Sequence, residues 1–231
     1  MSISLPIFIL NYKTYSEATG WRAFNLSEIA TRLSNDYGIS IIIAPQFVDI
    51  PTISSKFNCP IFAQHIDPIT PGKHTGQILP ESIKTAGGIG TILNHAERQI
   101  PFDILKRTVA RAKELNLKVC ICAENLEIAS KAALLNPDYI AFELPELIGT
   151  GKSISTTKPE LVKSSVKKIL DSNRDVIPLC GAGISSGKDV YAALKLGTQG
   201  ILLASAFCKA KDPELLLTDL LKAVKKYFAE K

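Results

Sequence analysis

The sequence predicts an α/β protein whose fold is a closed (β/α)8 barrel, and three observations lead to this fold class. Short apolar, β-branched runs alternate with segments of helical periodicity along all 231 residues. Eight strand–helix units can be counted, and eight such units close a barrel. No Pro/Ser-rich linker or low-complexity segment interrupts them, so residues 1–231 are expected to form a single domain. A doubly wound open sheet is the alternative, because a miscount of one or two units would produce it.

The first half of the chain supplies four of these units. Apolar runs predict strands at residues 6–10, 39–44, 60–63 and 89–93. The second run is almost entirely isoleucine, which is typical of a strand covered on both faces. Helical periodicity follows at residues 21–33, 47–54 and 81–86, and in a segment marked by Phe102, Leu105, Val109 and Ala112. A long polar loop separates the third strand from its helix, which starts after Pro80.

The second half of the chain repeats the pattern. Strands are predicted at residues 118–122, 139–142, 176–180 and 200–203. Helices are predicted at residues 127–135 and 188–196, with Gly197 as the C-terminal glycine of the latter. Another helix follows the cap signals Thr157 and Pro159. Apolar residues mark it and the final helix: Val162, Val166, Ile169 and Leu170, then Leu216, Leu217, Leu220, Leu221 and Val224.

Charge and hydropathy argue against nucleic-acid and membrane partners. The net charge is +5, and the densest basic segments, Lys167-Lys168 and residues 222–226, have helical spacing among apolar residues. We therefore expect solvated helix faces there, with only a weak positive field that helps an anionic substrate arrive. No apolar stretch approaches the ~20 residues of a membrane span.

The N-terminus and the cysteines predict a cytoplasmic protein. Residues 1–6 contain neither the basic region nor the apolar region of a signal peptide. The cysteines are odd in number, and four of the five lie in or beside apolar runs, so we expect buried, reduced thiols. Cys120 and Cys122 point the same way from one strand, where packing is a better interpretation than metal binding.

Polar residues follow three of the predicted strands, and in a barrel the carboxyl ends of the strands carry function. Asn11 and Lys13, two residues apart, can both point into the barrel mouth. His95 follows the fourth strand, and Glu143 ends the sixth. The Pro-led, Gly-rich segment 145–151 comes directly after Glu143. Surface residues and an ordinary turn would explain each feature alone, but together they indicate one site.

Small residues end the last two strands. Gly181, Gly183 and Gly187 follow the seventh strand, and Ala204 and Ser205 follow the eighth. Small side chains let backbone N–H groups approach an anion, and these two loops form the usual phosphate site of such a barrel. Ligand-free tight turns are the alternative. A carboxylate base beside an anion site predicts proton abstraction from a small phosphorylated substrate.

Taken in order, these segments resemble triosephosphate isomerase, a TIM-barrel enzyme. The matching segments are Asn11-x-Lys13, Asn94-His95-x-Glu97-Arg98, Glu143 with Ile148-Gly149-Thr150-Gly151, and Cys180-Gly181-Ala182-Gly183-Ile184-Ser185. The short length and the segments 64–68 and 74–76 resemble the archaeal branch. The resemblance covers essentially the whole chain.

The resemblance implies an isomerase of glycolysis and gluconeogenesis that interconverts glyceraldehyde 3-phosphate and dihydroxyacetone phosphate through an enediolate, without cofactor or metal. Glu143 would move the proton between C1 and C2, and a neutral His95 would polarise the carbonyl, a division of roles known for this family. Lys13 would neutralise charge and Asn11 would position the substrate. The residues implied in substrate and phosphate binding are Asn11, Tyr12, Lys13, Ile148, Gly149, Gly183, Ala204 and Ser205. Residues 145–152 would form a lid.

The same resemblance implies an oligomer. The sequence also departs from the usual family pattern at three positions. The loop around Thr75 would insert into a partner subunit, which gives a homodimer, and archaeal relatives indicate a tetramer as an alternative. Leu144 stands where the family usually has proline, and Ala96 stands where serine is common. Gly183 replaces a serine, so its contact with phosphate would come from the backbone.

Two other functions remain as alternatives from the residues. His65-x-Asp67 could begin the metal site of a sugar-phosphate epimerase, although no Asp ends the second, sixth or seventh strand. The fold could also carry a non-catalytic protein that binds phosphorylated metabolites. The intact set of Lys13, His95 and Glu143 favours the isomerase over both.

Overall fold

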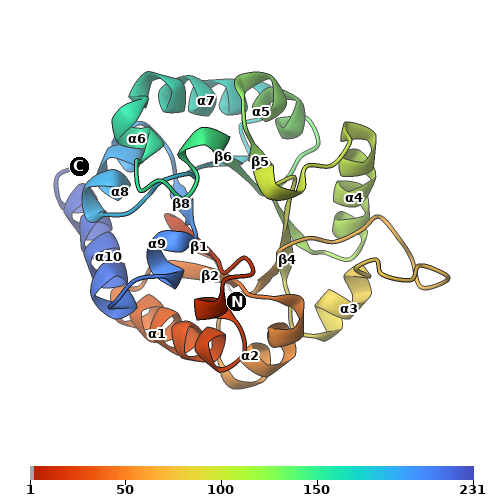
Figure 1. Ribbon diagram of the computed structural model, residues 1–231. Helices are drawn as coiled ribbons and strands as arrows, with labels where there is room; N and C mark the ends of the chain where they lie inside the picture. Colours follow the sequence, from red (N-terminus) through yellow and green to blue (C-terminus); the bar gives the residue numbers. More distant parts are fainter. Residues whose placement is uncertain (1–2) are drawn as a thin grey trace.

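Eight parallel strands close a barrel in this computed structural model, which describes residues 3–231 (Figure 1). The order of neighbouring strands is β2-β1-β8-β7-β6-β5-β4-β3. A parallel bridge between Ile43 and Ile61 joins the two ends of this order, at β2 and just before β3. The strands are β1 (Ile7–Asn11), β2 (Ser40–Ala44), β3 (Phe62–Ala63), β4 (Gly90–Leu93), β5 (Lys118–Ala123), β6 (Tyr139–Phe142), β7 (Ile177–Cys180) and β8 (Gly200–Leu203).

Helices surround the barrel on its outside (Figure 1). They are α1 (Trp21–Tyr37), α2 (Ile50–Lys56), α3 (Pro80–Thr85), α4 (Phe102–Glu114), α5 (Leu126–Ala133), α6 (Ile154–Thr157), α7 (Pro159–Ser172), α8 (Gly187–Lys195), α9 (Ser205–Cys208) and α10 (Pro213–Ala229). Four short 3-10 helices lie in the loops: η1 (Ser16–Ala18), η2 (Phe47–Asp49), η3 (Ala96–Arg98) and η4 (Pro145–Leu147). Because each crossover carries a helix back over the sheet, all eight strands run parallel.

The alternation of side chains along the strands divides the apolar residues between two cores. Ile7 and Ile9 of β1 point into the barrel, whereas Phe8 and Leu10 pack against the helices. All of the remaining strands, β2 to β8, also contribute side chains to this inner core: Ile42, Ala44, Phe62, Ile92, Cys120, Cys122, Tyr139, Ala141, Leu179 and Leu202. The barrel is therefore filled with side chains, and a ligand can bind only at one of its ends.

The structure confirms the predicted (β/α)8 barrel, and the open-sheet alternative is wrong. Each observed strand begins and ends within two residues of its prediction. The prediction missed α6, α9, η1, η3 and η4, because a single turn is too short to show periodicity. The helix marked by Phe102, Leu105, Val109 and Ala112 is α4, which begins at Phe102, although Phe102 itself is 44% exposed.

All five cysteines are free and buried, as predicted. Cys120 and Cys122 both face the inner core, so the packing interpretation of this pair is confirmed. Among residues 3–231, no helix combines the length and the apolar character that crossing a bilayer requires.

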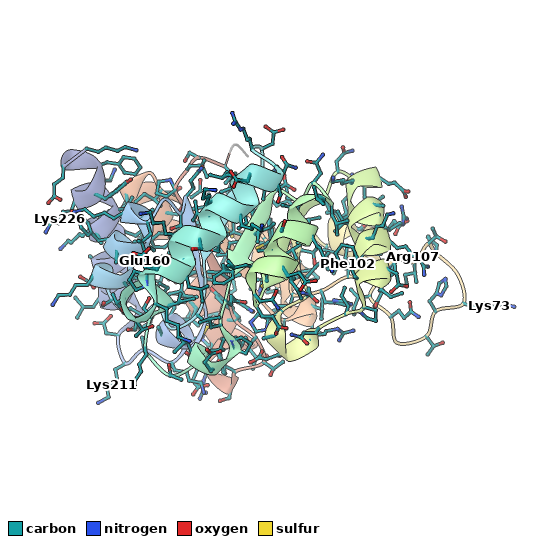
Figure 2. The ribbon with its side chains drawn as sticks, turned by 90° about the horizontal axis from the view of Figure 1, so that it is seen from above. Lys73, Phe102, Arg107, Glu160, Lys211 and Lys226 are labelled. Carbon is teal, nitrogen blue, oxygen red and sulfur yellow. The ribbon has the colours of Figure 1, made fainter. Side chains whose placement is uncertain are left out.

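The polar loop between β3 and α3 stands out from the barrel. Residues 70–77 are exposed, and Figure 2 shows Lys73 at the tip of this projection, far from the body of the protein. Arg111 of α4 holds one side of the loop, since its Nε donates to the carbonyl of Ile69 at 3.0 Å. A well-held loop with an exposed tip is typical of a binding segment.

Candidate active site

One cavity of about 370 Å³ opens at the carboxyl ends of the strands, where a barrel carries its function. Five βα loops line it, those after β1, β4, β6, β7 and β8. The lining residues are Lys13, His95, Glu143, Ile148, Gly149, Thr150, Gly151, Ala182, Gly183, Ile184, Ser185, Leu202, Leu203, Ala204, Ser205, Ala206 and Lys209. The structure thus brings together Lys13, His95 and Glu143, which are far apart in the sequence.

Glu143 is the buried carboxylate of this cavity. It extends β6 by one residue, because its backbone N–H donates to the carbonyl of Ala123 on β5 at 3.0 Å. Its side chain is buried, and its Oε2 has no hydrogen-bond partner among the described residues. A buried oxygen without a partner is costly, so its presence indicates a functional role.

The space for Glu143 depends on Gly181 at the end of β7. A Cβ at Gly181 would lie 2.3 Å from Cγ and 2.6 Å from Oε1 of Glu143. Such distances are far shorter than a carbon–carbon contact allows. The first glycine of this loop therefore makes room for the carboxylate rather than for a tight turn, a role that the sequence alone did not reveal.

His95 faces Glu143 with a defined ring nitrogen. It caps η3, where its Nδ1 accepts the backbone N–H of Glu97 at 3.1 Å. Because an N–H can only donate, Nδ1 carries no proton, and the neutral ring has its proton on Nε2. That nitrogen lies 3.7 Å from Oε2 of Glu143. A proton donor and an unpartnered carboxylate oxygen therefore face each other at the cavity.

Lys13 is held in an unusual backbone conformation. Its φ is +48°, in the left-handed region that a non-glycine residue rarely adopts. The side chain of Asn11 accepts its N–H at 3.0 Å, and Gln64 donates to its carbonyl at 2.8 Å. Its Nζ lies 2.7 Å from Oε1 of Glu97. Both backbone groups of Lys13 are thus satisfied, which fixes the start of its side chain at the cavity.

The structure gives Asn11 a supporting place, and it brings in Gln64, which sequence reasoning missed. Asn11 is buried beneath Lys13 and does not line the cavity. Gln64 also donates to the carbonyl of Ala44, so it joins the ends of β1 and β2. Its position directly after the third strand was the available signal.

Tyr12 does not reach the cavity, and its implied part in substrate binding needs correction. Its side chain is fully buried between barrel and helices, and its hydroxyl lies 3.2 Å from Oγ of Ser27. Its backbone N–H donates to the carbonyl of Ala44 at 3.0 Å. Strand alternation explains the outcome, since Tyr12 must point away from the face that Lys13 serves.

Three buried thiols lie near enough to Glu143 to feel its charge. Burial raises the pKa of Cys120, Cys122 and Cys180, and the negative charge of Glu143 raises each further. The thiols therefore stay protonated and neutral at physiological pH. These thiols consequently add no second negative charge beside Glu143.

Small residues from the loops after β6, β7 and β8 also line the cavity. Gly149 and Gly183 have φ values of +75° and +73°. A Cβ at Gly183 would lie 1.9 Å from the carbonyl oxygen of Lys152, so only glycine fits this contact. Ala204 and Ser205 line the cavity at the start of α9. Of the residues implied in phosphate binding, Ile148, Gly149, Gly183, Ala204 and Ser205 all lie here.

The segment between Glu143 and α6 covers one side of the cavity. Leu144 is buried in the outer core and anchors the beginning of the segment. Glu146 of η4 pairs with Lys158 at 3.0 Å, but both side chains are exposed, so this pair holds the segment only weakly. Weak surface contacts beyond a fixed anchor are suited to a segment that moves.

His65 and Asp67 tie the base of the projecting loop. Nε2 of His65 lies 3.1 Å from Oδ1 of Asp67. Oδ2 of Asp67 accepts the N–H of Ile78 at 2.6 Å. Within residues 3–231, no group of three potential His, Cys, Asp or Glu ligands is assembled. The pair thus has a structural task and lacks the donor set that the epimerase alternative needs.

The family described as Triosephosphate isomerase matches residues 6–224. The chain is 45% identical to the triosephosphate isomerase of Methanocaldococcus jannaschii, over 94% of this chain and 100% of that protein. It is also 45% identical to the enzyme of Methanobacterium bryantii, over 95% and 97% of the two chains. With the enzyme of Methanothermus fervidus it shares 44% identity, over 94% and 97%.

Proposed function

Since the chain belongs to the triosephosphate isomerase family, we propose how its residues divide the interconversion of glyceraldehyde 3-phosphate and dihydroxyacetone phosphate. Glu143 is the base that carries the proton between C1 and C2. His95 donates a hydrogen bond from Nε2 to the carbonyl oxygen, and Lys13 balances the negative charge of the enediolate. The reaction serves glycolysis and gluconeogenesis.

One observation carries this assignment: within residues 3–231, Oε2 of Glu143 has no hydrogen-bond partner, and it lies 3.7 Å from Nε2 of His95 at the cavity. The proton on Nε2 allows His95 to polarise a carbonyl, while the carboxylate takes a proton from the adjacent carbon. The two groups thus act on neighbouring atoms of one substrate. The fixed backbone of Lys13 supports its place as the third member.

The small residues of the cavity are assigned to the phosphate. Ile148, Gly149, Gly183, Ala204 and Ser205 line the cavity, and the small side chains among them let a phosphate approach backbone N–H groups. Residues 145–152 act as a lid that excludes water, because a solvated enediolate phosphate would eliminate its phosphate group. Leu144 anchors the lid in the core where the family usually has proline.

The projecting loop is assigned to subunit contact. The exposed residues 70–77, which include Thr75, project away from the barrel, with Lys73 at the tip (Figure 2). Insertion into a partner subunit gives a homodimer, and a tetramer is the alternative assembly. The free and buried thiols support the cytoplasm as the compartment.

A coupled assay of both directions tests the proposal. Purified protein should interconvert the two triose phosphates at the same rate before and after treatment with a chelator, because the proposed groups need no metal. Loss of activity on chelation, restored by a divalent cation, would favour the epimerase alternative. Binding of triose phosphate without turnover would favour a non-catalytic protein.

A further inference from the structure

One buried carboxylate outside the reacting groups gathers the loop that follows β7. Asp189, in the first turn of α8, is 7% exposed. Its Oδ2 accepts the backbone N–H groups of Ser185 and Ser186, both at 3.0 Å. The two hydroxyls lie 3.2 and 2.9 Å from the same oxygen. The carboxylate therefore fixes Ser185, which lines the cavity two residues after Gly183, and its neighbour Ser186.

Asp189 also holds α6, the short helix that follows the lid. Thr156 of α6 donates to its Oδ1 at 3.4 Å, and Ser155 of α6 donates to its backbone carbonyl at 2.9 Å. The N–H of Ile154 donates to the carbonyl of Ala182 at 3.4 Å, which adds a direct link between the two segments. Through these bonds, α6 and the loop after β7 are held as one unit.

The hydroxyl of Ser185 has two acceptors for a single proton. It lies 3.2 Å from Oδ2 of Asp189 and 3.3 Å from the carbonyl oxygen of Gly151 in the lid. Four donors also compete for one carboxylate oxygen, which is more than it satisfies well. The hydroxyl can therefore exchange its acceptor, Asp189 for Gly151. The carboxylate keeps its other donors in either arrangement.

We propose that Asp189 is a positioning residue for phosphate binding, which fixes the loop after β7 relative to the lid and lets Ser185 exchange its hydrogen bond between them. Asp189 does not line the cavity and acts through Ser185 and Ser186. Charge-assisted hydrogen bonds to a buried carboxylate are strong enough to fix a loop of small residues. This inference rests on the proposed function, since it assigns the loop to phosphate.

The test measures phosphate recognition separately from turnover. Binding of glycerol 3-phosphate, an unreactive phosphorylated triol, is measured by calorimetry for the wild type, Asp189→Ala and Asp189→Asn. Isomerisation of triose phosphate and of phosphate-free glyceraldehyde is measured alongside. Asp219→Ala is the matched control, because Asp219 also accepts an N–H at the start of α8, that of Gly187 at 2.6 Å.

Asp189→Ala should raise the dissociation constant of glycerol 3-phosphate and the KM of triose phosphate about tenfold, with turnover of glyceraldehyde unchanged. Asp189→Asn keeps one acceptor oxygen without the charge, and it should raise both constants about threefold. Asp219→Ala should change neither constant. The asparagine variant keeps the test valid if the alanine variant does not fold.

Unchanged binding of glycerol 3-phosphate by Asp189→Asn would overturn the inference. So would an equal loss of activity toward phosphorylated and phosphate-free substrates, because that would indicate a general structural role. The binding measurement needs no turnover. Absence of isomerisation by the wild type, which would defeat the proposed function, is therefore distinguishable from failure of this inference.

Discussion

Substitution of Gly181 by alanine should strongly reduce the isomerase activity, because the added Cβ would collide with the side chain of Glu143. The three atoms nearest the added Cβ all belong to the side chain of Glu143, with Cγ at 2.3 Å. Ordinary contact begins at 3.4 Å, so the carboxylate must move by about 1 Å. The φ of Gly181 is not in the left-handed region, so the backbone itself accepts alanine. The substitution therefore tests the position of the base alone.

A displacement of about 1 Å in a catalytic group costs roughly 10²-fold in rate. We expect kcat/KM of Gly181→Ala to fall by about that factor, which corresponds to about 2.7 kcal/mol of transition-state stabilisation. The fall should be mainly in kcat, because Gly181 does not line the cavity. The coupled isomerase assay measures both constants.

A double-mutant cycle separates this contact from general damage. Overpacking should cost Gly181→Ala about 1–3 kcal/mol of unfolding free energy in the wild type. In a Glu143→Ala background the crowded atoms are absent, so most of that cost should disappear. Denaturant titration of the four proteins measures the coupling. An undiminished cost in the Glu143→Ala background, or full activity of Gly181→Ala, would refute the reasoning.

Three further predictions concern the projecting loop, through His65 and Thr75, and the support of Lys13 by Gln64. Burial lowers the pKa of His65 below 6.5, so the unfolded chain takes up this proton first on acidification. The free energy of unfolding should therefore fall below about pH 6.5 by up to about 1.4 kcal/mol per pH unit, and less steeply in His65→Gln; equal slopes in urea titrations would contradict this. Thr75→Arg places a charge at the tip of the projecting loop and should yield monomers in light scattering, whereas an unchanged mass would remove the loop from assembly. Gln64→Ala removes the donor to the carbonyls of Lys13 and Ala44, and kcat/KM should fall about tenfold; a wild-type rate would show that Lys13 needs no such support.

The barrel could be predicted from the sequence because its signals are periodic and repeated. Alternation along β1 and the isoleucine run of β2 reflect burial on both faces, and such patterns survive small errors in boundaries. Elements of a single turn, such as α6 and α9, leave no periodic trace. Their boundaries depend on contacts made by distant segments, and so they became visible only in three dimensions.

The sequence located only those site residues that carry a reactive side chain and also lie at the end of a strand. Lys13, His95 and Glu143 carry reactive groups at strand ends, so the barrel rule located them. Gln64 and Asp189 act through hydrogen bonds to distant loops, and a sequence position alone does not specify those partners. The spacing Ser186-x-x-Asp189 was a usable capping signal for the latter. Tyr12 shows the opposite case, since the family resemblance implied a binding role for a residue whose side chain is fully buried away from the cavity.

The central claim is that Glu143 is the base for a triose phosphate held in this cavity, and Glu143→Gln tests it most directly. Glutamine keeps the shape of the side chain but removes its capacity to accept a proton. We expect kcat for isomerisation to fall by about 10³-fold or more, with binding of glycerol 3-phosphate retained. A wild-type rate in this variant would remove Glu143 from the mechanism and contradict the account.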